Sequence, residues 1–199
     1  MDMNDIFNTG LNSLISPTKT ANELIKKKLG LGDGALTVVL GSLVLAVVAA
    51  LAVVIAATWM GMIVSLMPMM GWASWMGTGT GILVAIGVLI AIPVTMLIVW
   101  LLLSLIVWII ASLVGGKGDF SKFATTLAFP FAALVAVSWI QPINIFAGIY
   151  SVYLLYVFLQ PTMKMDQNKA AITVLALFAL ATLCSLFFGA ASLWAMPRW

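Results

Sequence analysis

The chain has 199 residues, of which 64% are hydrophobic and 8% are charged, and its mean hydropathy is +1.20. A soluble domain carries roughly 45–50% apolar and 25% charged residues. This composition excludes an ordinary soluble domain and predicts an integral membrane protein. Because the apolar runs take up most of the chain, we expect one membrane domain and no separate soluble one. The formal net charge is +3 at pH 7.

Residues 1–34 are the sustained polar stretch and are expected to form a cytosolic or interfacial amphipathic segment. Apolar residues recur near helical spacing in its first part, at Ile6, Phe7, Leu11, Leu14 and Ile15. Ser16 followed by Pro17 is a helix-start signal and predicts a second helix that ends near Leu29. Both helices are expected to lie flat on the inner leaflet, with lysines at the head groups. The alternative is a solvated, partly flexible tail.

The first membrane span is expected at 35–57, close to the 20 or so residues that cross a 30 Å hydrocarbon core. Two pairs of small residues four apart would let a neighbouring helix approach: Ala46 with Ala50, and Ala52 with Ala56. Residues 58–80 contain no charge but several glycines and tryptophans. They are interpreted as an interfacial connection, and a re-entrant path is left open.

The apolar run at 81–113 would measure about 50 Å as one helix at 1.5 Å per residue. That length is too great for an upright span and too small for two spans with a turn. Pro93 would kink a single helix. The positions of the lysines decide between one crossing and two.

Three further spans are expected at 123–140, 143–159 and 170–193. If 81–113 crosses once, eight of the nine basic residues lie on the N-terminal side of the membrane, and Arg198 lies on the other. Such asymmetry is what the positive-inside rule demands. The prediction is an all-α integral membrane protein with a five-helix transmembrane bundle and one or two N-terminal interfacial helices. Its N-terminus is expected in the cytosol and its C-terminus outside.

The positions of the tryptophans also favour five membrane spans, because an indole side chain prefers the membrane interface. Six are expected at the outer interface: Trp59, Trp72, Trp75, Trp139, Trp194 and Trp199. Trp100 and Trp108 fall inside the long second span and should pack against the bundle or lipid.

Four features resemble prokaryotic members of the Yip (Ypt-interacting protein) domain family. They are the ISPTKTANELIKKK lead, the long second span, the GGKGDFSK loop leading to Pro130, and a fifth span that opens with KMDQNKAAI. The resemblance covers nearly the whole chain and implies a five-span domain with a cytosolic N-terminus, in the cell membrane of a prokaryote. In eukaryotic relatives it implies vesicle traffic through Rab-type GTPases. GTPase binding is not carried over, because this chain has no Asp-Leu-Tyr-Gly-Pro stretch and no long N-terminal extension.

Lysines of the expected cytosolic side form a candidate surface for lipid head groups or a partner: Lys26, Lys27, Lys28, Lys117, Lys122, Lys164 and Lys169. Each basic residue near an anionic surface contributes on the order of 1 kcal/mol. The alternative role of these lysines is orientation of the spans alone. Asp119 and Asp166 are expected to pair with lysines across the two loops.

The loop before the third span contains the glycines Gly115, Gly116 and Gly118. A phosphate-binding loop needs Gly, four residues, and then Gly-Lys-Ser/Thr between a strand and a helix. Here Asp119 follows the last glycine and a membrane helix precedes the loop. The glycines are therefore interpreted as a structural turn that permits positive φ. Asp119 or Ser121 would cap the helix that follows.

Three tyrosines spaced three apart share a face of the fourth span: Tyr150, Tyr153 and Tyr156. They form either an in-membrane packing face or a ligand face, and their hydroxyls need partners in an apolar setting. Cys184 is expected to be a small buried apolar residue.

The chain has no histidine and one cysteine, which excludes an internal disulfide and a Cys/His metal site. The expected spans hold no ionisable group besides Cys184 and tyrosines, which disfavours enzymes and ion-coupled transporters. The predicted function is a non-catalytic scaffold or adaptor that contacts membrane lipids, anionic ones included, and a partner membrane protein or a second copy. No cofactor, metal or nucleic acid is expected. The alternative is an oligomeric passive channel or small-molecule transporter, lined by Thr95, Ser104, Thr125, Thr126 and Ser138.

Overall fold

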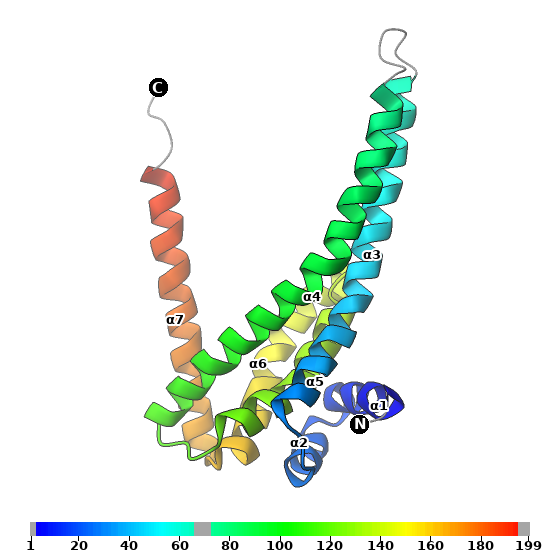
Figure 1. Cartoon of the computed structure of the whole chain (residues 1–199). Coiled ribbons are helices and arrows are strands. Elements are labelled where there is room, and N and C mark those ends of the chain that lie inside the picture. Colours follow the sequence, from blue (N-terminus) through cyan, green and yellow to red (C-terminus); the bar gives the residue numbers. More distant parts are fainter. Residues whose placement is uncertain (1–2, 66–72, 195–199) are drawn as a thin grey trace.

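A computed structural model describes residues 3–65 and 73–194, and within these ranges all the regular secondary structure is helical. Two short helices precede five long ones (Figure 1). In chain order they are α1 (Met3–Ile15), α2 (Pro17–Lys26), α3 (Leu31–Ser65), α4 (Ala73–Leu113), α5 (Phe120–Val137), α6 (Gln141–Met163) and α7 (Gln167–Trp194).

The five long helices are apolar and long enough to cross a membrane. The candidate spans are Leu31–Met62, Gly79–Leu113, Phe120–Val137, Gln141–Met163 and Gln167–Leu186. Much of the exposed surface of these helices is leucine, isoleucine and valine. Such a surface suits lipid, because hydrocarbon is as apolar as these side chains. The prediction of an all-α membrane protein with a five-helix bundle is confirmed.

The α3–α4 hairpin is the most elongated part of the molecule. Its two helices lie side by side and extend well beyond the turn that joins α5 to α6 (Figure 1). At 1.5 Å per residue, the 35 residues of α3 and the 41 residues of α4 measure about 52 and 62 Å. Close contact is possible because small residues meet: a Cβ atom added to Gly81 would clash with Ala57.

Both helices of the hairpin continue into the segment interpreted as an interfacial connection. α3 runs to Ser65 and α4 starts at Ala73, while residues 66–72 lie outside the described residues. Ala46 and Ala50 are buried, whereas Ala52 and Ala56 are exposed, so one of the two expected small-residue pairs packs. α4 changes direction along its length (Figure 1), and Pro93, which lacks a backbone donor, is its central residue.

Tryptophans of the hairpin and of the α5–α6 turn do not share one level. Trp59 and Trp139 are both exposed, yet α3 extends well beyond the turn that holds Trp139 (Figure 1). The side chains of the other four tryptophans expected at the outer interface lie outside the described ones: Trp72, Trp75, Trp194 and Trp199. Trp100 and Trp108 of α4 pack inward, and their Nε1 atoms donate to the carbonyl oxygens of Ala124 (3.1 Å) and Gly118 (3.0 Å).

α5 is the centre of the bundle and contacts α1, α2, α3, α4 and α6. It is the most buried of the five candidate spans and includes the fully enclosed rings of Phe123 and Phe129. α3 crosses it closely at Gly41, where an added Cβ atom would lie 2.6 Å from the carbonyl oxygen of Ala132. The shortest of the five long helices is thus the one that contacts the most other helices.

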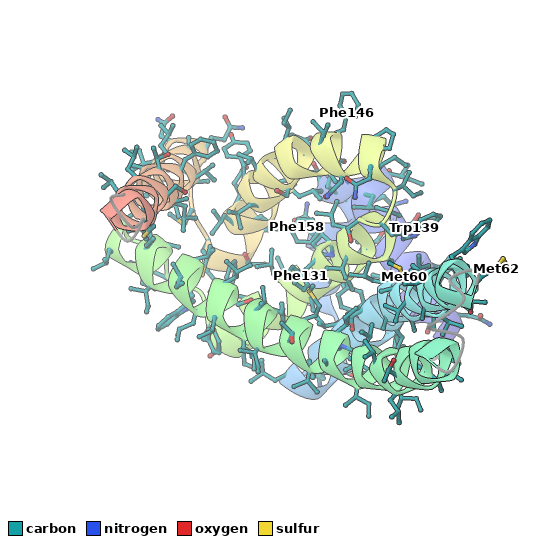
Figure 2. The ribbon with its side chains drawn as sticks, turned by 90° about the horizontal axis from the view of Figure 1, so that it is seen from above. Met60, Met62, Phe131, Trp139, Phe146 and Phe158 are labelled. Atoms are coloured by element: carbon teal, nitrogen blue, oxygen red, sulfur yellow. The ribbon has the colours of Figure 1, made fainter. Side chains whose placement is uncertain are left out.

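α1 and α2 are docked on the bundle, which differs from the alternative of a solvated tail. α1 contacts α5, where Gly10 lies against Phe129 and Ala133. α2 contacts α6, where Leu24 joins a buried cluster that includes Phe158. From above, Phe158 points to the inside of the bundle and Phe146 of the same helix points away from it (Figure 2).

α2 begins at Pro17 as expected but ends at Lys26 rather than near Leu29. Ser16 occupies the N-cap position, but its hydroxyl makes no capping hydrogen bond. The start of this helix therefore depends on the fixed φ of proline and its missing N–H.

Candidate functional site

Two loops are locked together at one end of the bundle, and we call them the loop pair. They are residues 114–119, between α4 and α5, and residues 164–166, between α6 and α7. The backbone N–H of Lys117 donates to the carbonyl of Met163 across the two loops (2.8 Å). Buried side chains from four helices and the second loop form one cluster: Val107, Ala111, Phe123, Leu159, Met163, Met165 and Ala170.

Glycines of the loop pair serve backbone geometry and close approach, in agreement with the expected structural turn. Gly115 has φ +99°, a value that favours glycine. A Cβ atom on Gly118 would lie 2.9 Å from Cα of Met163 and would collide with the carbonyl oxygen of Thr162. One on Gly116 would lie 2.9 Å from the carbonyl oxygen of Ala111.

The same loop cannot act as a phosphate cradle of the kind that glycine-rich loops supply. A cradle requires free backbone N–H groups that point at the ligand. Consecutive amides here already donate to backbone carbonyls: Gly115 to Ser112, Gly116 to Ala111 and Lys117 to Met163. The turn is therefore closed on itself.

Carboxylates of the loop pair cap helices instead of pairing with lysines. Asp119 accepts a hydrogen bond from the backbone N–H of Lys122 (3.0 Å), which caps α5 as predicted. Asp166 accepts from the backbone N–H of Lys169 (2.8 Å) at the start of α7. The expectation that these two acids pair with lysines across the loops is wrong. Short aspartate side chains are held by the nearest free amides instead.

All seven lysines of the candidate surface are exposed: Lys26, Lys27, Lys28, Lys117, Lys122, Lys164 and Lys169. They lie at or just after the C-terminal end of α2, in the loop pair, and in the first turns of α5 and α7, at the bottom of Figure 1. We call this region the lysine end. Among the described residues, a single ion pair joins a lysine to a carboxylate, that of Lys19 with Glu23 in α2. None of the seven lysines therefore pairs with a carboxylate of the described residues.

Two lysines in or next to the loop pair have distinctive positions. Lys164 ends α6 in the left-handed region, with φ 52°. Nζ of Lys169 lies over the other loop, 3.5 Å from the point that a Cβ atom on Gly115 would occupy. An ammonium group from α7 thus stands beside the glycine turn.

The tyrosines of α6 divide between packing and an open surface. The hydroxyl of Tyr150 donates to the carbonyl of Leu14, which ties α6 to α1. The rings of Tyr150 and Tyr153 lie 5.6 Å apart. Tyr156 is partly buried between two clusters, whereas Tyr153 is half exposed. The packing interpretation describes Tyr150 and Tyr156, and Tyr153 remains available to a ligand.

Two open apolar grooves flank Tyr153. One, of about 710 Å³, lies between α6 and α7 and also includes Tyr156 and Phe178; we call it the α6–α7 groove. The other, of about 460 Å³, lies between α6, α5 and the end of α1 and includes Leu14 and Tyr150. Sequence periodicity did not indicate these grooves, because groove residues and lipid-facing residues are equally apolar.

Hydroxyl groups considered for a pore lining are not gathered on one surface. Thr125, Thr126 and Ser138 donate to carbonyls of their own helix. Ser104 is fully buried without a hydrogen-bond partner, and Thr95 is exposed.

Cys184 is exposed, so the expectation that it is buried is wrong. The second half of α7 stands apart from the other helices (Figure 1), and its side chains from Leu180 to Leu186 are exposed. A buried position would need a neighbouring helix that this chain does not place there.

The fold and the loop pair define a class: a helical integral membrane protein whose polar loops gather at a lysine-rich end. A family model for the Yip1 domain matches residues 11–189, nearly the whole chain. The chain therefore belongs to the Yip1 domain family, which agrees with the resemblance seen in its sequence. Neither the curated proteins nor the solved structures gave a significant match.

Proposed function

We propose that this Yip1-family protein is a non-catalytic membrane scaffold or adaptor that binds anionic lipid through its lysine end and holds a partner membrane protein or a second copy. The observation that carries the proposal is the set of seven exposed lysines without carboxylate partners at one end of the described structure. Near an anionic leaflet each contributes on the order of 1 kcal/mol. Together they would keep anionic lipid at this end in preference to neutral lipid.

The orientation of the chain belongs to the same proposal. Cytosolic loops carry an excess of lysine and arginine, and the cytosolic leaflet is anionic. The lysine end is therefore assigned to the cytosol of a prokaryotic cell, with the C-terminus outside. In a Cys184→Ser background, a membrane-impermeant thiol reagent added from the cytosolic side should modify Lys117→Cys and leave Trp199→Cys unmodified. The reverse pattern would overturn the orientation.

The docked helix α1 supports contact with the lipid surface, because it has three distinct sides. Its buried side faces α5 with Ile6, Gly10 and Ser13. A second side of the helix carries exposed apolar residues spaced four apart: Met3, Phe7, Leu11 and Ile15. Exposed polar residues complete the helix, among them Asn4, Asn8 and Asn12. α1 lies crosswise to α3 near the lysine end (Figure 1), the orientation of a helix in the membrane interface.

Absence of intramembrane chemistry favours a scaffold over an enzyme. Beyond their first turns, which contain Asp33, Lys122 and Lys169, the described spans offer tyrosines and Cys184 as their ionisable groups. The sequence contains no histidine. General acid–base catalysis and ion-coupled transport both depend on ionisable groups placed at the reacting or transported species.

The test is purification from native membranes within their own lipid, followed by identification of the lipids and proteins retained. We expect enrichment of anionic lipid over the bulk membrane, together with a retained membrane protein or a second copy of this chain. Finding neither would refute the proposal. Solute flux through the purified protein in sealed vesicles would instead indicate a channel.

A further inference from the structure

We propose that the loop pair and the first turn of α7 form a binding site for one phosphate monoester, the head group of phosphatidic acid, held by the ammonium groups of Lys117, Lys164 and Lys169. This inference rests on the proposed function, because it assigns one head-group class and one place at the lysine end to the anionic lipid. A free phosphate ion has the same chemistry, so the two sources have to be separated by experiment.

Two contacts between the loops bring these lysines together from distant parts of the sequence. The backbone N–H of Lys117 is bonded to the carbonyl of Met163, the residue before Lys164. Nζ of Lys169 lies 3.5 Å from the point that a Cβ atom on Gly115 would occupy, and Gly115 is two residues before Lys117. All three lysines are exposed, so their flexible four-carbon stems can bring three ammonium groups to one ligand.

The backbone that carries Lys117 and Lys164 is held in place. A Cβ atom on Gly118 would lie 2.9 Å from Cα of Met163, so the two loops touch. Met163 and Met165 on either side of Lys164 are buried. Because this backbone is already ordered, a ligand has to immobilise little more than the lysine side chains, which lowers the cost of binding. The loop amides that are already bonded to carbonyls take no part, and the site depends on side-chain charge.

The acidic residues of the two loops leave these ammonium groups unpaired. Asp119 and Asp166 each direct a carboxylate oxygen to a backbone N–H, that of Lys122 and that of Lys169. Neither forms an ion pair with a lysine of the described residues. The charge of Lys117, Lys164 and Lys169 is therefore available to an external anion.

The number of ammonium groups favours a monoester over a diester. A phosphate monoester carries about −1.5 to −2 charges at pH 7 and three acceptor oxygens. Each of the three lysines can then donate a charge-assisted hydrogen bond to its own oxygen. A diester head group such as phosphatidylglycerol has one negative charge and two unesterified oxygens, so it leaves one lysine without a partner.

Two triple variants separate this site from the general charge of the lysine end. The loop variant combines Lys117→Gln, Lys164→Asn and Lys169→Gln; asparagine suits position 164, where φ is 52°. The α2 variant combines Lys26→Gln, Lys27→Gln and Lys28→Gln. It removes the same number of exposed charges from the same end of the molecule, but away from the loop pair.

The full-length protein is reconstituted with equal amounts of phosphatidic acid, phosphatidylglycerol and phosphatidylcholine. Lipid that stays bound through detergent exchange is counted by native mass spectrometry. Wild type should retain phosphatidic acid over phosphatidylglycerol, and both over phosphatidylcholine. Lys169→Gln alone should lower retention of phosphatidic acid about fivefold, the factor that corresponds to about 1 kcal/mol. The loop variant should lose the preference for phosphatidic acid, and the α2 variant should keep it.

The contrary outcomes distinguish this site from the proposed function. Equal retention of all three lipids by wild type would refute both. Equal retention of the two anionic lipids, above phosphatidylcholine, would overturn this site and leave the proposed function intact. A preference for phosphatidic acid that the α2 variant loses as fully as the loop variant would also overturn the site, because the charge of the whole end would then explain it.

Titration calorimetry in detergent separates the two sources of phosphate. Short-chain phosphatidic acid should bind wild type more tightly than inorganic phosphate does, and the loop variant should bind neither. Equally tight binding of the two, lost in the loop variant, would support the site and assign it to free phosphate. Failure of both to bind wild type would overturn it.

Discussion

The lysine end and the opposite end of the molecule are built in different ways. At the lysine end, four helices and two loops meet in one buried cluster, and glycines let backbones touch. At the opposite end, the α3–α4 hairpin and the second half of α7 project separately, with exposed apolar side chains (Figure 1). The contrast teaches that helices from the whole bundle pack together at one end, while at the other end the hairpin and α7 each expose apolar side chains.

The largest expected effect of a substitution is at Trp100, beside the lysine end. Its side chain lies against Gly34 and belongs to a buried cluster with Val38, and its Nε1 donates to the carbonyl of Ala124. Trp100→Ala should lower the free energy of unfolding by about 3 kcal/mol, the lower end of the range for soluble cores, because transfer into hydrocarbon contributes nothing within a membrane. Denaturation by sodium dodecyl sulfate in mixed micelles measures this change in the free energy of unfolding.

Trp139→Ala is the matched control for Trp100→Ala, since Trp139 is about half exposed at the α5–α6 turn. Its expected effect is below about 0.5 kcal/mol, as for substitutions away from buried features. Equal losses in the two variants would break the comparison between a packed region and a lipid-facing one.

A smaller effect is expected at the loop pair. Gly118→Ala places a methyl group against the backbone of Thr162 and Met163, which cannot withdraw as a flexible side chain would. Overpacking of this kind costs about 1–3 kcal/mol. Gly87→Ala is the control, because nothing lies within 4 Å of its added Cβ atom and alanine is the better helix former. Thermal unfolding in detergent should therefore show a lower Tm for the first variant and an equal or higher Tm for the second.

Tyr150→Phe should have a more local effect. It removes the hydrogen bond to the carbonyl of Leu14, which joins α6 to α1. The expected loss is about 0.5–1.5 kcal/mol. Hydrogen exchange should rise in α1 and stay unchanged in the loop pair. A uniform rise across all helices would contradict the view that α1 is docked as a separate unit.

The smallest effect is expected at Ser104, whose buried hydroxyl has no hydrogen-bond partner. A buried polar group without a partner is costly, so Ser104→Ala should leave stability unchanged or raise it by up to about 1 kcal/mol. The same denaturation assay measures the change. A clear loss of stability would mean that the hydroxyl has a bonded partner in the membrane.

Sequence reasoning predicted what depends on hydropathy, charge and local chemistry. Apolar runs long enough to cross a membrane predicted the five long helices. The positions of the lysines predicted which loops lie together at the lysine end. Asp119 or Ser121 was predicted to cap α5, because short polar side chains accept hydrogen bonds from the free amides of a helix start, and Asp119 is the residue that does so.

The rest depends on contacts between distant segments, which composition does not encode. Nothing in the sequence near Cys184 indicates that the second half of α7 stands apart from the other helices. Asp166 was expected to pair with a lysine, but α7 starts directly after it and places a free backbone amide within reach of its carboxylate. The sequence does not predict the α6–α7 groove, because apolar residues such as Val152 and Leu175 occur equally at packed helix contacts and at open surfaces.

The most direct test of the central claim compares wild type with a variant in which the seven lysines of the lysine end are replaced by glutamine: Lys26, Lys27, Lys28, Lys117, Lys122, Lys164 and Lys169. Both proteins are extracted with their surrounding membrane, and the share of anionic lipid is measured against the bulk membrane. The account predicts enrichment around wild type, and around a Lys19→Gln control, that disappears in the seven-lysine variant. The same share of anionic lipid around a folded seven-lysine variant and wild type would contradict it.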